Sequence, residues 1–436
     1  MPDRCLAEWL TLLEARHPSE IDLGLDRVAA VWSELMARRL SDKNPIQLPR
    51  AITVAGTNGK GSCIASMQGI LLHHGLRVGA TTSPHFIDYN ERISVQGEPV
   101  CDAVIVKAFA EIEAARQSIS LTYFEFGTLA ALLVFADANL DIMLLEVGLG
   151  GRLDAINIID ADVAVVTSIA LDHQAWLGDT RELIAAEKLG IARAGRPLLI
   201  GEPDSPQGFS EMIAATGARA LRIGADFSVD QQADHFHARL QTAEGKPLLI
   251  EHLPVSGLLP INKTLAIQAL ICAGVGLNSE LVVKALEAVS LAGRQQQLRF
   301  NGTRVILDVA HNPAAAVALA GNLPAISGRY RAVASVLSDK DWSAIVAPLA
   351  DIFADWQVAE ISDTERATKG QTLVEVLYNA GLSGKLHETV EEAFLNALSQ
   401  SAADDVVVVF GSFYTVSTVL KLHQQSQEKN CNGFVQ

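Results

Sequence analysis

A short glycine-rich stretch near residue 56 has the residue types that bind phosphate. Residues 53–62 read Thr-Val-Ala-Gly-Thr-Asn-Gly-Lys-Gly-Ser, between an apolar run at 51–55 and a helix-like run from residue 62. Glycines let backbone N–H groups approach phosphate oxygens without a Cβ clash, and the following helix presents its positive end to the same anion. Lys60 is suited to neutralise phosphate charge, and the Ser62 hydroxyl is suited to bind Mg²⁺. The alternative is a plain glycine-rich turn, because the spacing differs from G-x-x-x-x-G-K-[ST].

Polar residues at the ends of other apolar runs are candidates for a metal site. Glu146 ends the run Ile-Met-Leu-Leu, and a carboxylate at a strand end beside a phosphate loop is placed to hold Mg²⁺. The alternative for Glu146 is an acid that caps the next loop. Taken alone, His173 after the run 163–169 is a structural or solvated histidine, and Ser83 before Pro84 is part of a turn.

Ordinary structure explains two further segments and part of a third. Lys188 lies in a helical pattern, where a lysine is usually solvated. In the string Asp-Val-Ala-His-Asn-Pro at 308–313, helix capping explains Asn312 and Pro313 but neither Asp308 nor His311. Arg294 has the planar fork that spans phosphate oxygens, although a solvated arginine in a connecting segment is the simpler reading.

Alternating strands and helices are expected to position these residues. Apolar strands separated by amphipathic helices predict a parallel sheet covered on both faces, with ligands at the carboxyl ends of the strands. The predicted strands of this first region are 51–55, 77–81, 141–147, 162–168 and 197–201, and its predicted helices are 62–74, 102–117, 123–138 and 181–194. A hairpin near 243–245 and helices at 262–276 and 279–289 follow.

After residue 293 the alternation begins again, which predicts a second and smaller α/β unit. Its predicted strands are 304–309, 331–337, 356–361 and 405–411, and its predicted helices are 313–323, 342–351, 372–380, 391–401 and 412–423. The polar tail 424–436 is expected to be disordered.

Composition limits the classes of function. The chain has 436 residues and a formal net charge of −16, which predicts two or three domains and argues against nucleic acid or an anionic membrane as a partner. The five cysteines show no paired spacing, so neither a zinc site nor a disulfide framework is indicated. With no signal-like or membrane-spanning apolar run, a cytoplasmic protein is expected, and a monomer is the default expectation.

The phosphate loop Gly-Thr-Asn-Gly-Lys-Gly-Ser and the D-x-A-H-N-P string resemble those of the Mur-ligase superfamily of ATP-dependent amide ligases. The later motifs resemble the folylpolyglutamate synthase/dihydrofolate synthase family, from Ile21 to about Val416. The resemblance implies an α/β fold with a P-loop ATPase domain over 1–292, a linker over 293–298 and a smaller Rossmann-like ligase domain over 299–436. It also implies ATP bound across the cleft between the domains and a hinge at the linker. One departure is the run Arg294-Gln-Gln-Gln, where the family has an aromatic residue and a single glutamine.

The resemblance also assigns roles to individual residues. It implies ATP contacts at Gly56, Thr57, Asn58, Gly59, Lys60, Gly61, Ser62, Asn262, Arg294 and Asp308. It implies metal ligands at Ser62, Ser83, Glu146 and His173, catalytic roles for Lys60, Lys188 and His311, and carbamylation of Lys188. It implies a pterin or folate pocket formed by Ile21, Asp22, Leu23, Thr122, Tyr123, Phe124, Glu125, Leu153, Asp154 and Ala155. For the segment 123–126 and for Asn262, the residues alone favour ordinary helix core and a helix cap.

The expected reaction is the ATP-dependent addition of L-glutamate to dihydropteroate and to reduced folates through an acyl phosphate, with Mg²⁺ as the metal. The alternatives are a folylpolyglutamate synthase only, another Mur-type ligase, or a regulatory P-loop switch. Only 55 residues precede Gly56, which argues against a cell-wall ligase with an additional domain before the loop. The sequence leaves open whether a monovalent cation is needed.

Overall fold

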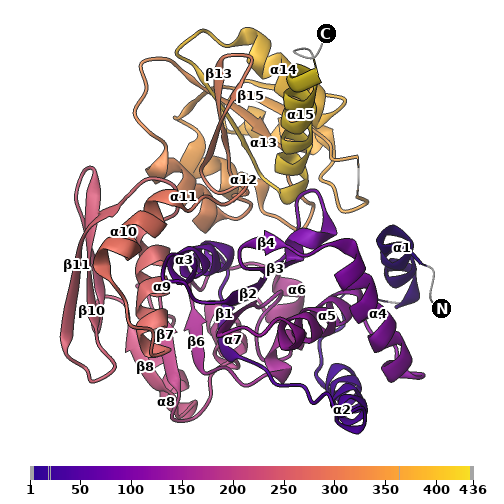
Figure 1. The fold of residues 1–436 in the computed structure, drawn as a ribbon. Helices are drawn as coiled ribbons and strands as arrows, with labels where there is room; N and C mark the ends of the chain where they lie inside the picture. Colours follow the sequence, from indigo (N-terminus) through magenta and orange to yellow (C-terminus); the bar gives the residue numbers. More distant parts are fainter. Residues whose placement is uncertain (1–3, 18, 20, 363, 433–436) are drawn as a thin grey trace. The chain divides into compact units, whose positions relative to one another are not determined.

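The computed structural model describes residues 4–17, 19, 21–362 and 364–432, and the chain divides into two compact units, Met1–Val289 and Ser290–Gln436 (Figure 1). The domain boundary that the sequence analysis places after residue 292 lies close to this division and stays a prediction. No helix in the described ranges is long and apolar enough to cross a bilayer.

The first unit is built on an eight-stranded sheet in the order β4-β3-β2-β5-β1-β6-β7-β8. The six strands from β2 to β8 in this order are parallel, while β3 and β4 pair antiparallel at one edge. The strands are β1 (Arg50–Ala55), β2 (Val78–Thr81), β3 (Ile93–Val95), β4 (Glu98–Pro99), β5 (Ile142–Glu146), β6 (Val163–Val166), β7 (Pro197–Ile200) and β8 (Arg219–Arg222).

Helices cover both faces of this sheet, which explains why the central strands are mostly apolar and do not alternate between apolar and polar residues. In β5, Met143 and Leu145 join one apolar core, whereas Ile142 and Leu144 join the other. The helices of the first core are α1 (Leu6–Arg16), α2 (Asp26–Ser41), α4 (Asp102–Arg116), α5 (Tyr123–Asp137), α7 (Arg181–Leu189) and α8 (Phe209–Ala215). The second core is formed by α3 (Lys60–His73), α9 (Pro260–Cys272), α10 (Ser279–Ala288) and a separate small sheet in the order β11-β10-β9.

The remaining elements of the first unit are short. The small sheet consists of β9 (Ser228–Gln231), β10 (His235–Gln241) and β11 (Pro247–Pro254), and the predicted hairpin joins its two longer strands. A short helix α6 (Gln174–Leu177) and two 3₁₀ turns, η1 (Tyr89–Arg92) and η2 (Ala155–Ile158), lie in the connections.

The second unit is a six-stranded sheet in the order β12-β13-β17-β14-β15-β16, parallel except for β12. Its strands are β12 (Gln296–Phe300), β13 (Thr303–Leu307), β14 (Tyr330–Ala334), β15 (Phe353–Ala359), β16 (Gly384–His387) and β17 (Val406–Phe410). Its helices are α11 (Pro313–Asn322), α12 (Trp342–Val346), η3 (Ala347–Leu349), α13 (Gly370–Asn379), α14 (Val390–Gln400) and α15 (Phe413–Asn432).

Two sequence expectations differ from this architecture. The predicted linker 293–298 includes the first residues of β12, which pair with β13. The expectation of a disordered tail is wrong for residues 424–432, because α15 continues to Asn432; residues 433–436 lie outside the described residues. Once the packed start of a helix has formed, extending the helix by one residue costs little free energy. The glutamines, glutamate and lysine of this segment are also good helix formers.

Candidate active site

The glycine-rich loop follows the central strand β1 and leads into α3. Gly59 has the left-handed conformation (φ 89°) as the N-cap of α3, and a Cβ there would lie 2.6 Å from the side-chain oxygen of Asn262. Any other residue here would have a strained backbone, and its Cβ would clash with the side chain of Asn262. The Lys60 ammonium donates to the carbonyl of Gly56 at 3.0 Å, and Ser62 is buried in the first turn of α3. The predicted ATP residue Asn262 thus lies against the predicted phosphate loop.

The loop is held by the segment that follows β6. The Thr57 N–H donates to the carbonyl of Ser168 at 2.9 Å, and the Asn58 N–H donates to the Ser168 hydroxyl at 2.9 Å. The Thr57 hydroxyl accepts from the N–H of Ala170 at 3.0 Å, while the Thr167 hydroxyl donates to the carbonyl of Asn58 at 2.6 Å. These bonds fix the loop backbone, which is a precondition for a preorganised phosphate site.

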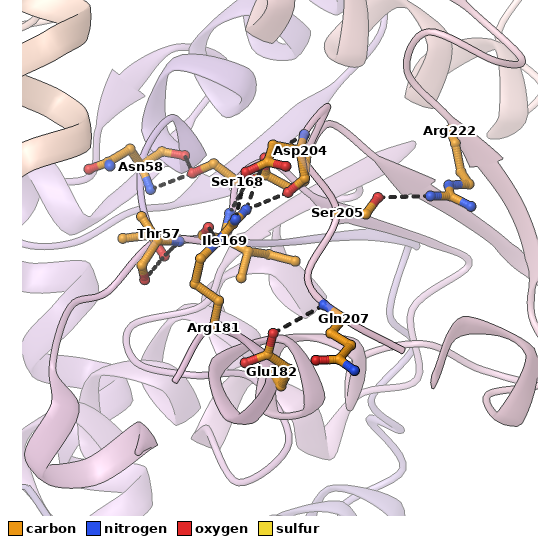
Figure 2. A network of polar contacts seen from close by, with 12 residues as sticks. Thr57, Asn58, Ser168, Ile169, Arg181, Glu182, Asp204, Ser205, Gln207 and Arg222 are labelled. Carbon is orange, nitrogen blue, oxygen red and sulfur yellow. Dashed lines mark hydrogen bonds and ion pairs between the residues drawn. The ribbon is translucent and has the colours of Figure 1, made fainter. Parts of the chain in front are cut away.

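Figure 2 shows that this second segment is itself tied to α7 and the loop after β7. The Arg181 guanidinium donates to the carbonyl of Ile169 at 2.9 Å and pairs with Asp204 at 2.7 Å. Glu202 accepts from the N–H of Ile169 at 2.7 Å. The phosphate loop is therefore held by the segment 167–170, and Arg181 and Glu202 hold that segment in turn. These supporting residues were not identified from the sequence.

The predicted metal residues follow four neighbouring strands. Ser83 follows β2, Glu146 ends β5, Ser62 follows β1 and His173 follows β6, and these strands are adjacent and parallel in the order β2-β5-β1-β6. The Ser83 N–H donates to Glu146 at 3.1 Å, and the Glu146 carboxylate is only 6% exposed. His173 is the N-cap of α6 in the left-handed conformation (φ 52°), which histidine adopts more readily than most residues.

The donor chemistry of this set fits Mg²⁺. A carboxylate and two hydroxyls supply hard oxygen ligands, and a buried carboxylate favours a nearby cation because burial without compensation is costly. In the ranges that the structure describes there is no group of three or more His, Cys, Asp or Glu side chains arranged around one point, and the predicted set contains only two residues of these types.

Lys188 differs most from a solvated helical lysine. It lies on α7 and is only 3% exposed. Burial, with a smaller contribution from the charge of Lys60, lowers the pKa of its amine from 10.5 to about 7. Close to neutrality a substantial fraction of this amine is therefore uncharged, which is the form that reacts as a nucleophile.

The turn after β5 packs against the helix of Lys188. A Cβ at Gly151 would lie 2.7 Å from the carbonyl of Glu187 and 3.2 Å from the Cα of Lys188. Asp154 holds this turn, because its two oxygens accept from the N–H groups of Leu149 at 2.8 Å and Ile156 at 3.0 Å. Burial raises the pKa of Asp154 to about 6. Both of its oxygens thus have backbone donors as partners, an arrangement that orders the turn.

The three predicted pterin segments meet, and Arg27 joins them. Its guanidinium pairs with Asp22 at 2.7 Å and with the buried carboxylate of Glu125 at 3.2 Å. The carbonyl of Leu153 accepts from the N–H of Gly24 at 3.2 Å, which brings the third segment to the first. Sequence reasoning missed Arg27, which lies in an ordinary amphipathic helix pattern.

Residues 122–125 combine helix capping with an aromatic surface. Thr122 and Glu125 form a capping box at the start of α5. The Thr122 N–H donates to the Glu125 carboxylate at 2.7 Å, and the Glu125 N–H donates to the Thr122 hydroxyl at 3.1 Å. The Phe124 ring lies against Gly148, where a Cβ would be 2.6 Å from the ring. The Tyr123 ring packs edge-on against Tyr89, and burial raises the pKa of Tyr123 to about 12.

A small pocket links the metal and pterin residues. It is lined by Thr81, Thr82, Ser83, Tyr89, Arg92, Phe124, Gly127, Thr128 and Glu146. The Arg92 guanidinium lies 5.5 Å from the ring centres of both Tyr89 and Tyr123 and donates to His85 at 2.8 Å. Sequence reasoning missed Arg92, although it is the cation of this pocket. Its position predicts recognition of an anionic or aromatic group here.

In the second unit, the predicted residues also gather. Asp308 accepts from the N–H groups of Gln295 at 3.0 Å and Ala310 at 2.9 Å, and burial raises its pKa above the ordinary value. The Arg294 guanidinium lies 5.2 Å from the ring centre of Phe413, and His311 lies 6.4 Å from the same ring. Asn312 caps α11, as predicted, by accepting from the N–H of Ala315 at 2.9 Å. Phe413 was not identified from the sequence.

Comparisons with known proteins agree with this geometry. A family model described as the Mur ligase, glutamate ligase domain matches residues 293–413. The dihydrofolate synthase/folylpolyglutamate synthase of Escherichia coli K12 is 43% identical over 419 residues, which cover 96% of this chain and 95% of that protein.

Solved structures of similar proteins match nearly the whole length of this chain. Escherichia coli FolC in complex with DHPP and ADP has a TM-score of 0.90 and 40% identity, covering 98% of this chain and 99% of that one. A bifunctional folylpolyglutamate synthase/dihydrofolate synthase with Mn, AMPPNP and L-glutamate bound has a TM-score of 0.87 and 41% identity, covering 97% of this chain and 99% of that one.

Proposed function

This chain belongs to the dihydrofolate synthase/folylpolyglutamate synthase family, and on that premise we propose how its residues carry out the reaction. The protein is an ATP-dependent carbon–nitrogen ligase with a divalent metal ion. It adds L-glutamate to dihydropteroate, which gives dihydrofolate, and to reduced folates, which extends their glutamate tail. The single observation that carries this function is the 43% identity over 96% of the chain.

The first step activates a carboxylate. A carboxylate oxygen of the acceptor attacks the γ-phosphorus of ATP, the bond from that phosphorus to the bridging oxygen breaks, and ADP leaves. In our proposal the backbone N–H groups of 56–62 and the Lys60 ammonium bind the phosphates, and Arg294 in the second unit provides a bidentate contact. Ser62, Ser83, Glu146 and His173 would hold Mg²⁺, which neutralises phosphate charge when bound.

The second step forms the amide. The amine of L-glutamate, after losing a proton, attacks the acyl carbon, and the tetrahedral intermediate expels inorganic phosphate. This chemistry needs no protein nucleophile. The side chains of the protein therefore position the substrates, neutralise charge and exclude water. We propose that Phe124 and the Asp22–Arg27–Glu125 chain orient the pterin end of the acceptor. The ion pairs of Arg27 with Asp22 and Glu125, and the hydrogen bond from the N–H of Gly24 to the carbonyl of Leu153, support this assignment.

Carbamylation of Lys188 is part of the proposal. A neutral amine adds CO₂ and releases one proton to give a carbamate anion. The buried amine has a pKa of about 7, so a fraction of it is uncharged close to neutrality. The test is Lys188→Ala, whose activity should collapse and partly return when a short carboxylate such as acetate is added. Full activity of the unrescued variant would overturn this role.

The function itself is tested by ADP release with MgATP and L-glutamate, adding dihydropteroate, a reduced folate monoglutamate or no acceptor, with product masses measured. We expect turnover with each acceptor and a mass increase of one glutamyl group. Reaction with the reduced folate alone would establish a folylpolyglutamate synthase only. ADP release that ignores every acceptor would refute the ligase.

A further inference from the structure

Three histidines gather on the small sheet β11-β10-β9 of the first unit, and none of them belongs to the site described above. The ring centres of His235 and His237 are 4.9 Å apart, those of His235 and His252 are 4.8 Å apart, and those of His237 and His252 are 5.3 Å apart. His235 and His237 are half-buried, and His252 is exposed.

The backbone explains why the three side chains meet. His235 and His237 alternate along β10 with the buried Phe236, so they share the face turned away from the core. The pairing of β10 with β11 shifts between Phe236 and Ala238, and His252 adopts the left-handed conformation (φ 57°) in this irregularity. Such a bulge re-aims a side chain, and here it adds His252 to the face of the other two.

The spacing of the rings matches a shared metal ion. With a Zn–N bond of about 2.1 Å, the centre of an imidazole ring lies roughly 3.2 Å from the ion, and tetrahedral angles then separate two ring centres by about 5.2 Å. The three observed separations lie within a few tenths of an ångström of this value.

One carboxylate contacts the cluster as an outer-shell partner of a metal ligand does. Asp234 lies 2.7 Å from Nδ1 of His235, so that its carboxylate accepts from Nδ1–H and leaves Nε2 with a free electron pair. The same contact holds the pKa of Asp234 below its ordinary value. Asp230 is the residue paired with His237 on the neighbouring strand β9, and its carboxylate forms an ion pair with Arg239 at 3.2 Å.

Binding requires the imidazoles to turn. In the part of the chain that the structure describes, no three donors already converge on one point, and Nδ1 of His237 accepts from the His252 N–H at 3.3 Å. A half-turn about χ2 exchanges the carbon and nitrogen edges of a ring and leaves its centre in place. The contact with the His252 N–H is long, and water is able to replace it at this exposed position.

We propose that His235, His237 and His252 form a binding site for one divalent transition-metal ion, of which Zn²⁺ is the best fit. Imidazole is the ligand that Zn²⁺, Ni²⁺ and Cu²⁺ favour, whereas the edge that ends at Glu146 offers the oxygen ligands of Mg²⁺. The ion would join β10 to β11. This proposal stands independently of the ligase reaction.

Zinc binding to the full chain without an affinity tag tests the proposal, measured by competition with a colorimetric chelator in excess Mg²⁺. We expect the unmodified chain to bind one more Zn²⁺ than the double variant His237→Asn/His252→Asn, whose affinity at this site should fall by at least about 100-fold. Asp234→Asn should lower the affinity by roughly tenfold, as the loss of an outer-shell partner does.

The matched control is His73→Asn, because His73 is an exposed histidine of the same unit that lies on α3. It should bind Zn²⁺ as the unmodified chain does. Hydrogen exchange supplies a second readout: Zn²⁺ should slow exchange in 235–241 and 247–254 of the unmodified chain and leave the double variant unchanged. Equal Zn²⁺ affinity in the double variant, or protection elsewhere but not in these two strands, would overturn the proposal.

Discussion

Replacing Lys188 by methionine should make the protein more stable and inactive, with a stabilisation that depends on pH. Lys188 is 3% exposed and burial is the main cause of its lowered pKa. Methionine is an unbranched apolar side chain of similar length, so it fills the same space without burying an amine.

The size of the effect follows from the pKa. A fall from 10.5 to about 7 means that the folded chain binds the proton more weakly than the unfolded chain. Because a tenfold change in proton affinity is about 1.4 kcal/mol, burial of the ammonium costs roughly 5 kcal/mol below pH 7. The cost falls to about 3 kcal/mol at pH 8 and to about 0.4 kcal/mol at pH 10.5, where half of the unfolded chains also carry a neutral amine. Stability of the unmodified chain therefore rises with pH across this window.

Urea unfolding followed by circular dichroism, in buffers stripped of CO₂, measures this difference at about pH 6, 8 and 10. Lys284→Met is the matched control, since Lys284 is an exposed lysine on the helix α10 of the same unit. We expect a higher unfolding midpoint for Lys188→Met at pH 6, a smaller difference at pH 8, and a pH-independent response for the control. A Lys188→Met variant that is less stable at pH 6, or a difference that does not change with pH, would refute the reasoning.

Three other perturbations test separate parts of the site. Arg27→Ala should raise the KM for the acceptor by about 10- to 100-fold and leave the KM for ATP unchanged, since it leaves the buried Glu125 without its ion-pair partner; equal effects on both constants in steady-state kinetics would contradict this. Gly59→Ala should raise the KM for ATP and destabilise the fold more than Gly75→Ala, which is also at positive φ but in open space and should show only a backbone strain of about 1–2 kcal/mol. Glu146→Gln should raise the Mg²⁺ concentration for half-maximal activity by at least about tenfold, and an unchanged Mg²⁺ titration would count against a ligand role.

The local features of this protein could be predicted from its sequence. The strand, turn and helix around Gly56 depend on neighbouring residues, and so does the Asn312 cap with Pro313 at the first turn of α11. The alternation of strands and helices also identified the fold class correctly, because a helix-covered parallel sheet requires apolar strands. The short strands β3, β4 and β16 were missed, since two to four residues carry too little periodicity to be recognised.

The remaining features depend on contacts between distant parts of the chain. The pattern of α7 gives no sign that Lys188 is buried, because the burial comes from packing against the turn that contains Gly151. Arg27 joins Asp22 to Glu125, a residue nearly a hundred positions away, and no spacing rule connects them. Arg92 was overlooked for the same reason. Burial and pairing of charged groups are properties of the folded chain rather than of a sequence window.

The hydrogen bonds of the phosphate loop have a consequence for how the chain folds during synthesis. Thr57 and Asn58 are bonded to residues 109 to 113 positions further along the chain. The central strand β1 likewise acquires its two neighbours only when β5 and β6 exist. A nascent chain therefore carries an exposed, apolar strand and an unformed nucleotide loop until residue 170 has left the ribosome. This delay predicts that a chain truncated before β6 exposes an unpaired apolar strand and is prone to aggregate.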